Sequence, residues 1–312
     1  MLAFLGSMFL GWGLGTNDAA NVFGTAVSSR MVRWRVAALL AALFVVLGAI
    51  IQGDTAVGTL TGLTSQTRLT ATITVIAAAL TVVLMTLLKL PVSTSQAVVG
   101  AIFGVGIMRG MLDLGGTTKV LLCWLGTPVG GAVFYLLFHC LFQAVIRKLK
   151  PSMLVLDPCI RGGLIIFGCY GAYALGANNV ANVSAVLVGS GLMEPRAAVL
   201  VGGISIAAGI LTFSKPVMLT VGRHIVEVSA FSALVVVLAE AATVHLYAFL
   251  GVPVSTSQAV VGGLFGIGLL KGFHLIRWGI LTRVTLAWIA TPFVSAAWAV
   301  LLYLLTHIEY RP

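Results

Sequence analysis

The chain has 312 residues, of which 60% are hydrophobic and only 8% are charged, and its mean hydropathy is +1.11. A soluble globular chain is roughly a quarter charged, so this composition excludes a soluble protein and indicates an integral membrane protein. The net charge of +10 comes from 18 Lys and Arg residues scattered between apolar runs, a distribution that argues against nucleic acid as a partner.

Ten apolar runs follow one another along the chain, each bounded by charge, Pro or Gly, as membrane helices usually are. A helix that crosses a bilayer needs about 20 mainly apolar residues, so most of the chain lies in contact with membrane lipid. We predict an all-α integral membrane protein with about ten transmembrane or re-entrant helical segments, located as a multi-pass protein in the cell membrane. The runs are 1–29, 36–52, 70–88, 92–108, 119–146, 162–190, 197–213, 230–250, 254–270 and 279–306.

Basic residues divide unequally between the two sets of loops that ten crossings create. One set holds thirteen of the 18 Lys and Arg residues and the other holds five. By the positive-inside rule the richer set, which includes the stretch 151–161, is expected in the cytoplasm. Both termini, including Pro312, are then expected outside.

The first run carries a polar motif, GTNDAANV, at 15–22, and a related sequence, GANNVANV, returns at 176–183. A carboxylate at membrane depth is costly and marks a functional site by default. A single Asn in a membrane helix often serves only to link helices, and both interpretations remain open here. The candidate residues are Asn17, Asp18 and Asn21, with Asn178, Asn179 and Asn182 in the second copy.

A second motif, PVSTSQAVVG, occurs identically at 91–100 and 253–262. Pro91 ends the preceding helix, and the Ser-x-x-Gln spacing that follows is that of a capping box, so a helix should begin here. The unpaired N–H groups and positive dipole of a helix N-terminus suit an anion. Capping of membrane helices alone is the simpler interpretation, but capping would accept many sequences. The side-chain donors are Ser93, Thr94, Ser95 and Gln96, with Ser255, Thr256, Ser257 and Gln258.

A weaker third pair, Trp124 with Thr127-Pro128 against Trp288 with Thr291-Pro292, completes an internal repeat. We predict a first repeat over 1–150, a cytoplasmic linker over 151–161 and a second repeat over 162–312. Five crossings per half is an odd number, so the repeats have inverted topology. Inverted repeats share one substrate site near the bilayer midplane.

Two further polar residues interrupt the run 230–250. Glu240 lines the pathway or binds a cation, whereas His245, which has no ligand cluster around it, is expected to be a hydrogen-bonded packing residue. Asp18 and Glu240 would repel an oxyanion unless a cation or a proton intervenes. We therefore expect an anion and cations to bind together, and the available oxygen ligands suit Na⁺.

These motifs, in this order, resemble the PiT family of inorganic phosphate transporters over nearly the whole chain. The resemblance implies a secondary transporter that imports inorganic phosphate with Na⁺ or H⁺ by alternating access, commonly as a homodimer and with no other cofactor. It implies that the motif hydroxyls and amides contact the anion, and that Asp18, Asn179 and Glu240 hold the cation. Many members have Asp at the position of Asn179 and His at those of Gln96 and Gln258, and the missing imidazoles favour Na⁺ over H⁺.

Three alternatives remain open at this stage. The first is the same mechanism acting on sulfate or another tetrahedral oxyanion, which hydroxyl and amide donors would also bind. The others are an anion channel and a membrane-embedded phosphotransfer enzyme. The sequence shows no HExxH motif and no nucleophile with a matched base, so it favours a protein that is not an enzyme.

Overall fold

The computed structural model describes residues 1–88, 92–224, 229–272 and 278–308, and every regular element in these ranges is a helix. Pro91 and Pro312, on which two of the sequence predictions rest, lie outside them. The first half contains α1 (Leu2–Ser28), α2 (Trp34–Gln52), α3 (Asp54–Leu63), α4 (Arg68–Leu87), α5 (Thr94–Arg109) and α6 (Leu114–Leu149). The second half contains α7 (Met153–Asn179), α8 (Ala181–Gly189), α9 (Pro195–His224), α10 (Ala230–Phe249), α11 (Thr256–Lys271) and α12 (Trp278–Ile308).

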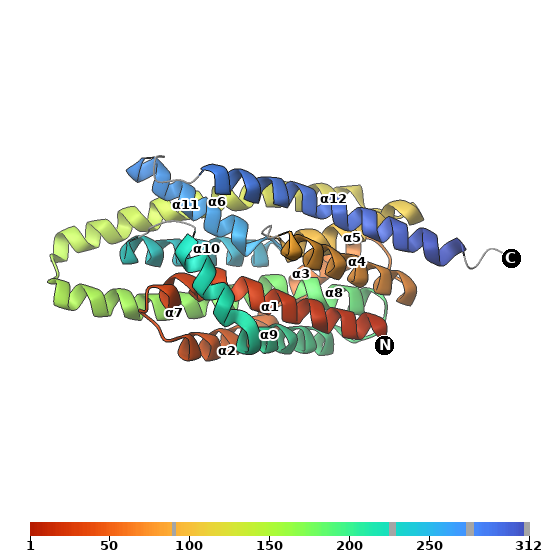
Figure 1. Cartoon of the computed structure of the whole chain (residues 1–312), viewed down its shortest axis with the longest axis horizontal. Coiled ribbons are helices and arrows are strands. Elements are labelled where there is room, and N and C mark those ends of the chain that lie inside the picture. The colour runs from red at the N-terminus through yellow and green to blue at the C-terminus, as the bar shows by residue number, and fades with distance from the viewer. Residues whose placement is uncertain (89–91, 225–228, 273–277, 309–312) are drawn as a thin grey trace.

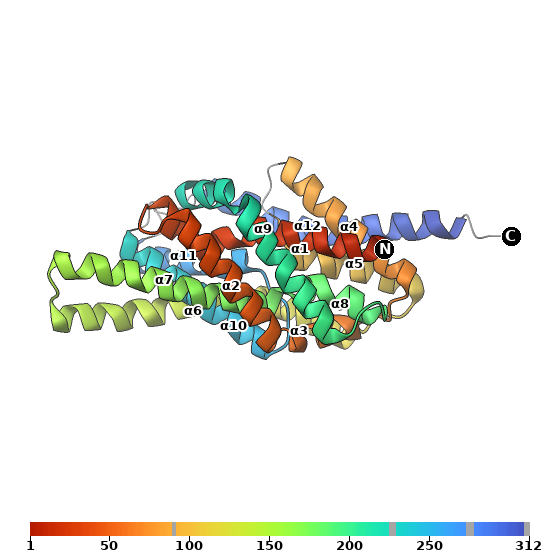
Figure 2. The same ribbon diagram turned by 90° about the horizontal axis from the view of Figure 1, so that it is seen from below.

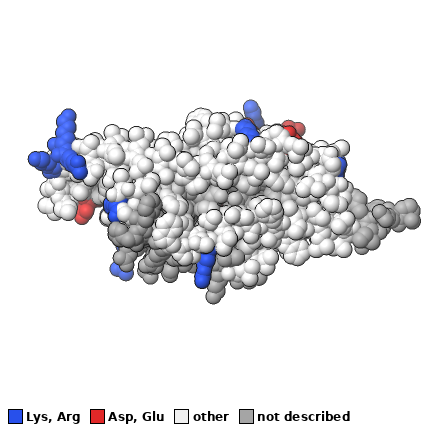
Figure 3. All heavy atoms as spheres, turned by 90° about the horizontal axis from the view of Figure 1, so that it is seen from above, with Lys and Arg blue, Asp and Glu red and all other residues white. Residues whose placement is uncertain are grey.

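Length and hydropathy identify seven helical stretches in the described chain that can cross a membrane, with α5 as a shorter apolar helix. Each of the ten predicted runs overlaps a helix, which confirms the all-α membrane fold. The face drawn in Figure 3 carries few charged side chains along its length, and a cluster of Lys and Arg lies at the end where α6 and α7 meet. A mostly uncharged face of this kind suits contact with lipid.

The structure differs from the sequence prediction at three places. Helix α3, in a segment rich in Thr and Gly, was not predicted, and packing against α8 overrides its weak helix propensity. Helix α7 begins at Met153, so most of the predicted linker 151–161 is helical. The single predicted run 162–190 is divided between α7 and α8, with Val180 between them.

Helices α6 and α7 form a long hairpin that projects beyond the rest of the bundle (Figures 1 and 2). The 36 residues of α6 correspond to about 54 Å, which exceeds the roughly 30 Å of the hydrocarbon core. The charged residues near the hairpin tip can therefore stand in water while the helices continue, which explains why charge did not mark a helix boundary here.

The helices of the two halves correspond at nearly the same offset as the motifs. Thr94 and Thr256, which open α5 and α11, are 162 residues apart, and so are Arg68 and Ala230, which open α4 and α10. The pair α4 and α5 lies toward one end of the long axis and the pair α10 and α11 toward the other (Figures 1 and 2). This arrangement is consistent with inverted repeats, whose exact boundaries and orientation in the membrane remain predictions.

The two halves interleave and do not form separate domains. Helix α1 packs on α9, α2 on α7, α5 on α12 and α6 on α11, so each of these pairs joins one helix from each half. Gly100 in α5 lies against the backbone of Pro292, and Gly262 in α11 lies against that of Pro128. The third repeated pair thus provides the helix surfaces on which the second motif packs.

Candidate functional site

The second motif begins a helix in each half, as its Ser-x-x-Gln spacing predicts. Ser93 is the N-cap of α5, and its hydroxyl accepts a hydrogen bond from the Gln96 N–H at 3.4 Å. Ser255 caps α11 in the same way, accepting from the Gln258 N–H at 3.4 Å. Both helix starts are buried, so their dipoles and N–H groups act in a region of low dielectric constant.

The start of α5 is joined to the second copy of the first motif by a closed network of side chains. The Ser95 hydroxyl donates to Asn179 Oδ1 at 3.1 Å and lies 3.2 Å from the Val254 carbonyl oxygen. The Asn182 amide donates to Ser95 Oγ at 2.8 Å and to Asn179 Oδ1 at 3.2 Å. Residues from α5, α7, α8 and the loop before α11 therefore meet at one point.

Asn178, the neighbouring residue, is bonded to backbone atoms alone in the part of the chain that the structure describes. Its amide nitrogen donates to the Val252 carbonyl oxygen at 2.8 Å, and its Oδ1 accepts from the Val254 N–H, also at 2.8 Å. The side chain is fully buried. It fixes the short extended segment that leads into α11.

The first copy of this motif, on α1, faces the start of α11 through fewer bonds. The Asn21 amide donates to Thr256 Oγ1 at 2.9 Å and to Ser257 Oγ at 3.0 Å. The Asp18 carboxylate is buried, with 7% of the residue exposed, and interacts with the Thr256 side chain. The structure thus brings both copies of each motif together. The first copy of the Asn motif, on α1, contacts the start of α11, and the second copy, on α7 and α8, contacts the start of α5.

Glu240 lies in α10 with no exposed surface. Neither carboxylate oxygen has a hydrogen-bond partner among the described residues, and the side chain interacts electrostatically with Asp18. A methyl group added at Gly171 would lie 3.2 Å from its Oε2 and 3.0 Å from Val22, so the carboxylate sits between α1, α7 and α10. A buried carboxylate without donors requires a proton or a cation to offset its charge.

Four other buried polar atoms of the motifs lack a partner within the described ranges. Each such group carries a desolvation cost of about 1–3 kcal/mol, so the set favours a ligand that supplies the missing bonds. Three are acceptor oxygens and one is a donor nitrogen: Gln96 Oε1, Gln258 Oε1, Asn182 Oδ1 and Asn179 Nδ2.

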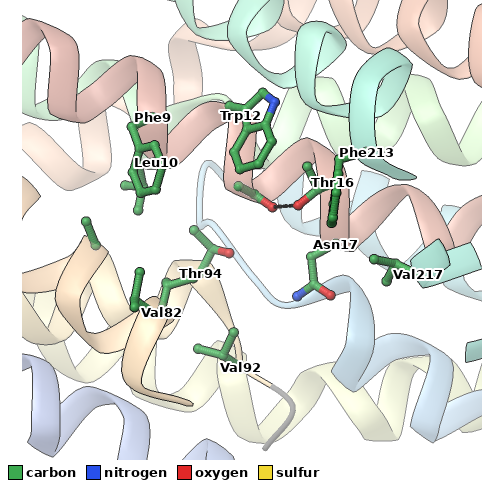
Figure 4. A pocket seen from close by; sticks show the side chains of 13 residues that line it. Phe9, Leu10, Trp12, Thr16, Asn17, Val82, Val92, Thr94, Phe213 and Val217 are labelled. Carbon is green, nitrogen blue, oxygen red and sulfur yellow. Dashed lines mark hydrogen bonds between the residues drawn. The ribbon is translucent and has the colours of Figure 1, made fainter. Parts of the chain in front are cut away.

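A cavity of about 290 Å³ reaches this region between α1, α4 and α9. Its walls are mostly apolar, and the polar side chains of Asn17 and Thr94 face it together with Val92 (Figure 4). Asn17 is only partly buried and makes no hydrogen bond to the described residues. The cavity therefore lies next to one side of the polar centre, at Asn17 and Thr94.

His245 is bonded as a packing residue, which confirms the sequence interpretation. Its Nε2 lies 2.8 Å from Gln52 Oε1, which can only accept, so Nε2 carries the proton and Nδ1 accepts from the Tyr170 hydroxyl at 2.9 Å. Tyr173 donates to the same Gln52 oxygen at 3.3 Å. These three partners were not found from the sequence, because isolated polar residues in apolar runs give no sign of which helices they link.

A polar centre enclosed by membrane-crossing helices, built twice from repeated motifs and reached by a cavity, defines a multi-pass membrane transport protein. Comparison with known proteins gives the particular kind. The model of the Phosphate transporter family matches residues 14–299, and the chain belongs to this family. It is a transporter of the cell membrane and not an enzyme.

Individual relatives cover nearly the whole chain. A protein of Methanocaldococcus jannaschii named "Putative phosphate permease" is 29% identical over 93% of this chain and 92% of its own. "Sulfate permease CysP" of Bacillus subtilis is 30% identical over 97% of this chain and 86% of its own. A solved structure, "The sodium-dependent phosphate transporter", has the same fold with a TM-score of 0.86, 23% identity and 98% coverage of both chains.

Proposed function

We propose that the protein imports inorganic phosphate by alternating access, coupled to a cation, with Na⁺ favoured over H⁺, and that it works as a homodimer. The observation that carries the proposal is the meeting of two buried helix starts, one from each repeat, at a single polar centre. Helix N-termini, hydroxyls and amides supply donors to a tetrahedral oxyanion. The repeated construction supplies the two similar arrangements that alternating access needs.

The coupling ion is assigned to two carboxylates and one amide. Asp18, Asn179 and Glu240 are the proposed cation residues, and the described chain holds no group of three or more His, Cys, Asp or Glu side chains. A cation at the proposed site would therefore be held mainly by amide, hydroxyl and carbonyl oxygens. Such oxygen ligands at the ends of membrane helices suit Na⁺. The solved structural relative is a sodium-dependent phosphate transporter, which supports the same ion.

Sulfate is the second candidate substrate, and the name of the Bacillus subtilis relative favours it. The discriminating experiment is uptake of labelled phosphate and of labelled sulfate into proteoliposomes, with Na⁺ and pH gradients imposed separately. We expect an inward Na⁺ gradient to drive phosphate above its external concentration, and a pH gradient alone to drive it less. If sulfate accumulates in preference to phosphate, sulfate is the substrate. If neither anion is ever driven above its external concentration, the protein is a channel.

Asp18→Asn tests the coupling role directly. The substitution keeps the shape of the side chain but removes the charge that would hold the cation, so phosphate binding should become weak and stop responding to Na⁺. The measurement is phosphate binding to purified protein across a Na⁺ titration at two pH values. Asp54→Asn is the matched control, because Asp54 is an exposed residue at the start of α3. If Asp18→Asn keeps the full Na⁺ response, Glu240 becomes the coupling candidate.

A further inference from the structure

We propose that Asn178 is a positioning residue that latches the segment before α11 in the present conformation, and that Asn17 latches the start of α5, at Val92, in the opposite-facing one. The inference rests on the proposed alternating access. It changes the role expected for both residues, which the sequence interpretation counted among the anion ligands.

The bonds of Asn178 leave it little capacity for an anion. Its oxygen and its nitrogen each bond the backbone of the same three-residue segment, at Val254 and at Val252. A planar amide that bridges a carbonyl oxygen and an N–H two residues apart holds the segment extended. Ser255 can then cap α11, which points the helix start at the polar centre.

Asn17 is the repeat counterpart of Asn178, 161 residues earlier, but it makes none of these bonds. It faces the cavity and has no hydrogen-bond partner in the part of the chain that the structure describes. The counterpart of Val254, at an offset of 162, is Val92, which lines the same cavity as Asn17 (Figure 4). Asn17 and Val92, which would form the equivalent latch, thus line the same cavity.

One bond of the polar network is repeated on both sides. The bond from Asn21 to Ser257 corresponds to the bond from Asn182 to Ser95, and both are present. Among the described residues, the two bonds of Asn178 have no counterpart at Asn17. Closing the cavity would bring the Asn17 oxygen toward the Val92 N–H, and the repeat-related movement on the other side would release Asn178.

Two further positions report which latch is closed. Gly13 lines the cavity one turn from Asn17, and a side chain added there would meet no atom within 4 Å. Its counterpart 161 residues later, Ala174, has no exposed surface. A cysteine at position 13 should react with a thiol reagent in the present conformation, and a cysteine at position 174 in the opposite one.

The experiment measures labelling rates of Gly13→Cys and Ala174→Cys, each in a chain whose four native cysteines are replaced, without substrate. Adding Asn178→Ala should lower the rate at position 13 and raise it at position 174, changing their ratio about tenfold because two buried hydrogen bonds are lost. Adding Asn17→Ala should move the ratio in the other direction. Ser184→Ala is the control, since its buried hydroxyl donates to the Val180 carbonyl oxygen four residues earlier and, among the described residues, to no other element.

Opposite shifts support the latch, whereas equal shifts, shifts of one sign, or changes no larger than those of Ser184→Ala overturn it. If Asn178→Ala fails to fold, Asn17→Ala still decides, because it must lower labelling at position 174 relative to position 13. The readout needs no phosphate and no Na⁺. A failed latch with normal phosphate uptake would leave the proposed function intact, and a wrong substrate would leave the latch measurable.

Discussion

The two copies of the first motif have nearly the same sequence but different surroundings. On the second-half side, Asn178, Asn179 and Asn182 are at most 1% exposed and joined to α5 and the loop before α11 by a closed network. On the first-half side, Asn17 and Asn21 are partly buried and a cavity remains. The difference teaches that one repeated motif can adopt two arrangements. In this conformation the second copy has the closed hydrogen-bond network and the first copy has the open cavity.

The helix packing around the motifs shows no such difference. Gly262 meets the backbone of Pro128, and Gly100 meets that of Pro292. The two halves therefore differ in their polar contacts and not in the helix packing around them. Substitutions in both halves can test each part of this comparison.

The largest effect is expected from Gly262→Ala and Gly100→Ala. A methyl group at either position would collide with a carbonyl oxygen of the partner helix, so a whole helix must move, at a cost of about 3 kcal/mol or more. The losses should be similar, because the two packings are equivalent. Thermal unfolding in detergent measures them, with Gly58→Ala, whose methyl group would meet open space, as the control. Clearly unequal losses would contradict the equivalence.

A smaller and unequal effect is expected from Ser95→Ala and Ser257→Ala. Among the described residues, the Ser95 hydroxyl contacts Asn179, Asn182 and Val254, whereas that of Ser257 accepts a single bond, from Asn21. Ser95→Ala should cost about 2 kcal/mol of unfolding free energy and Ser257→Ala about 0.5–1 kcal/mol. Denaturation of both variants without phosphate or Na⁺ gives the comparison. Equal costs would show that the polar asymmetry has no energetic weight.

An effect about as small as that of Ser257→Ala is expected from Ser93→Ala and Ser255→Ala, which remove one equivalent capping bond each. An N-cap is worth about 1 kcal/mol, so both variants should fold. Both should nevertheless take up phosphate several times more slowly at limiting concentration, since each helix start supplies half of one site. Normal uptake by both variants would count against a shared site. If only one of the two variants takes up phosphate slowly, the anion is bound by the helix start of that half alone.

Much of this architecture follows from the sequence. Composition and hydrophobic runs predict the all-α membrane fold, the Ser-x-x-Gln spacing predicts the starts of α5 and α11, and the duplicated motifs predict that distant segments share one centre. These features depend on local chemistry or on repetition, both of which are visible in a single chain.

Other features depend on tertiary contacts that no local pattern reveals. Helix α3 forms because α8 covers it, and α7 starts early because the hairpin continues past the membrane. The bonds of Asn178 join it to residues 74 and 76 positions away, so its sequence alone could not separate positioning from anion contact. The partners of His245 were hidden for the same reason.

The interleaving of the halves also constrains how the protein is made. Helix α5 is complete at Arg109, but its partner α12 begins only at Trp278, so translation at about 5–20 residues per second separates them by roughly 10–30 s. During that interval the hydroxyls and amides of Ser93, Thr94 and Gln96 lack their final neighbours inside a bilayer. The newly inserted first half therefore keeps these polar groups without their final neighbours, and the packing is completed only when the last helix arrives.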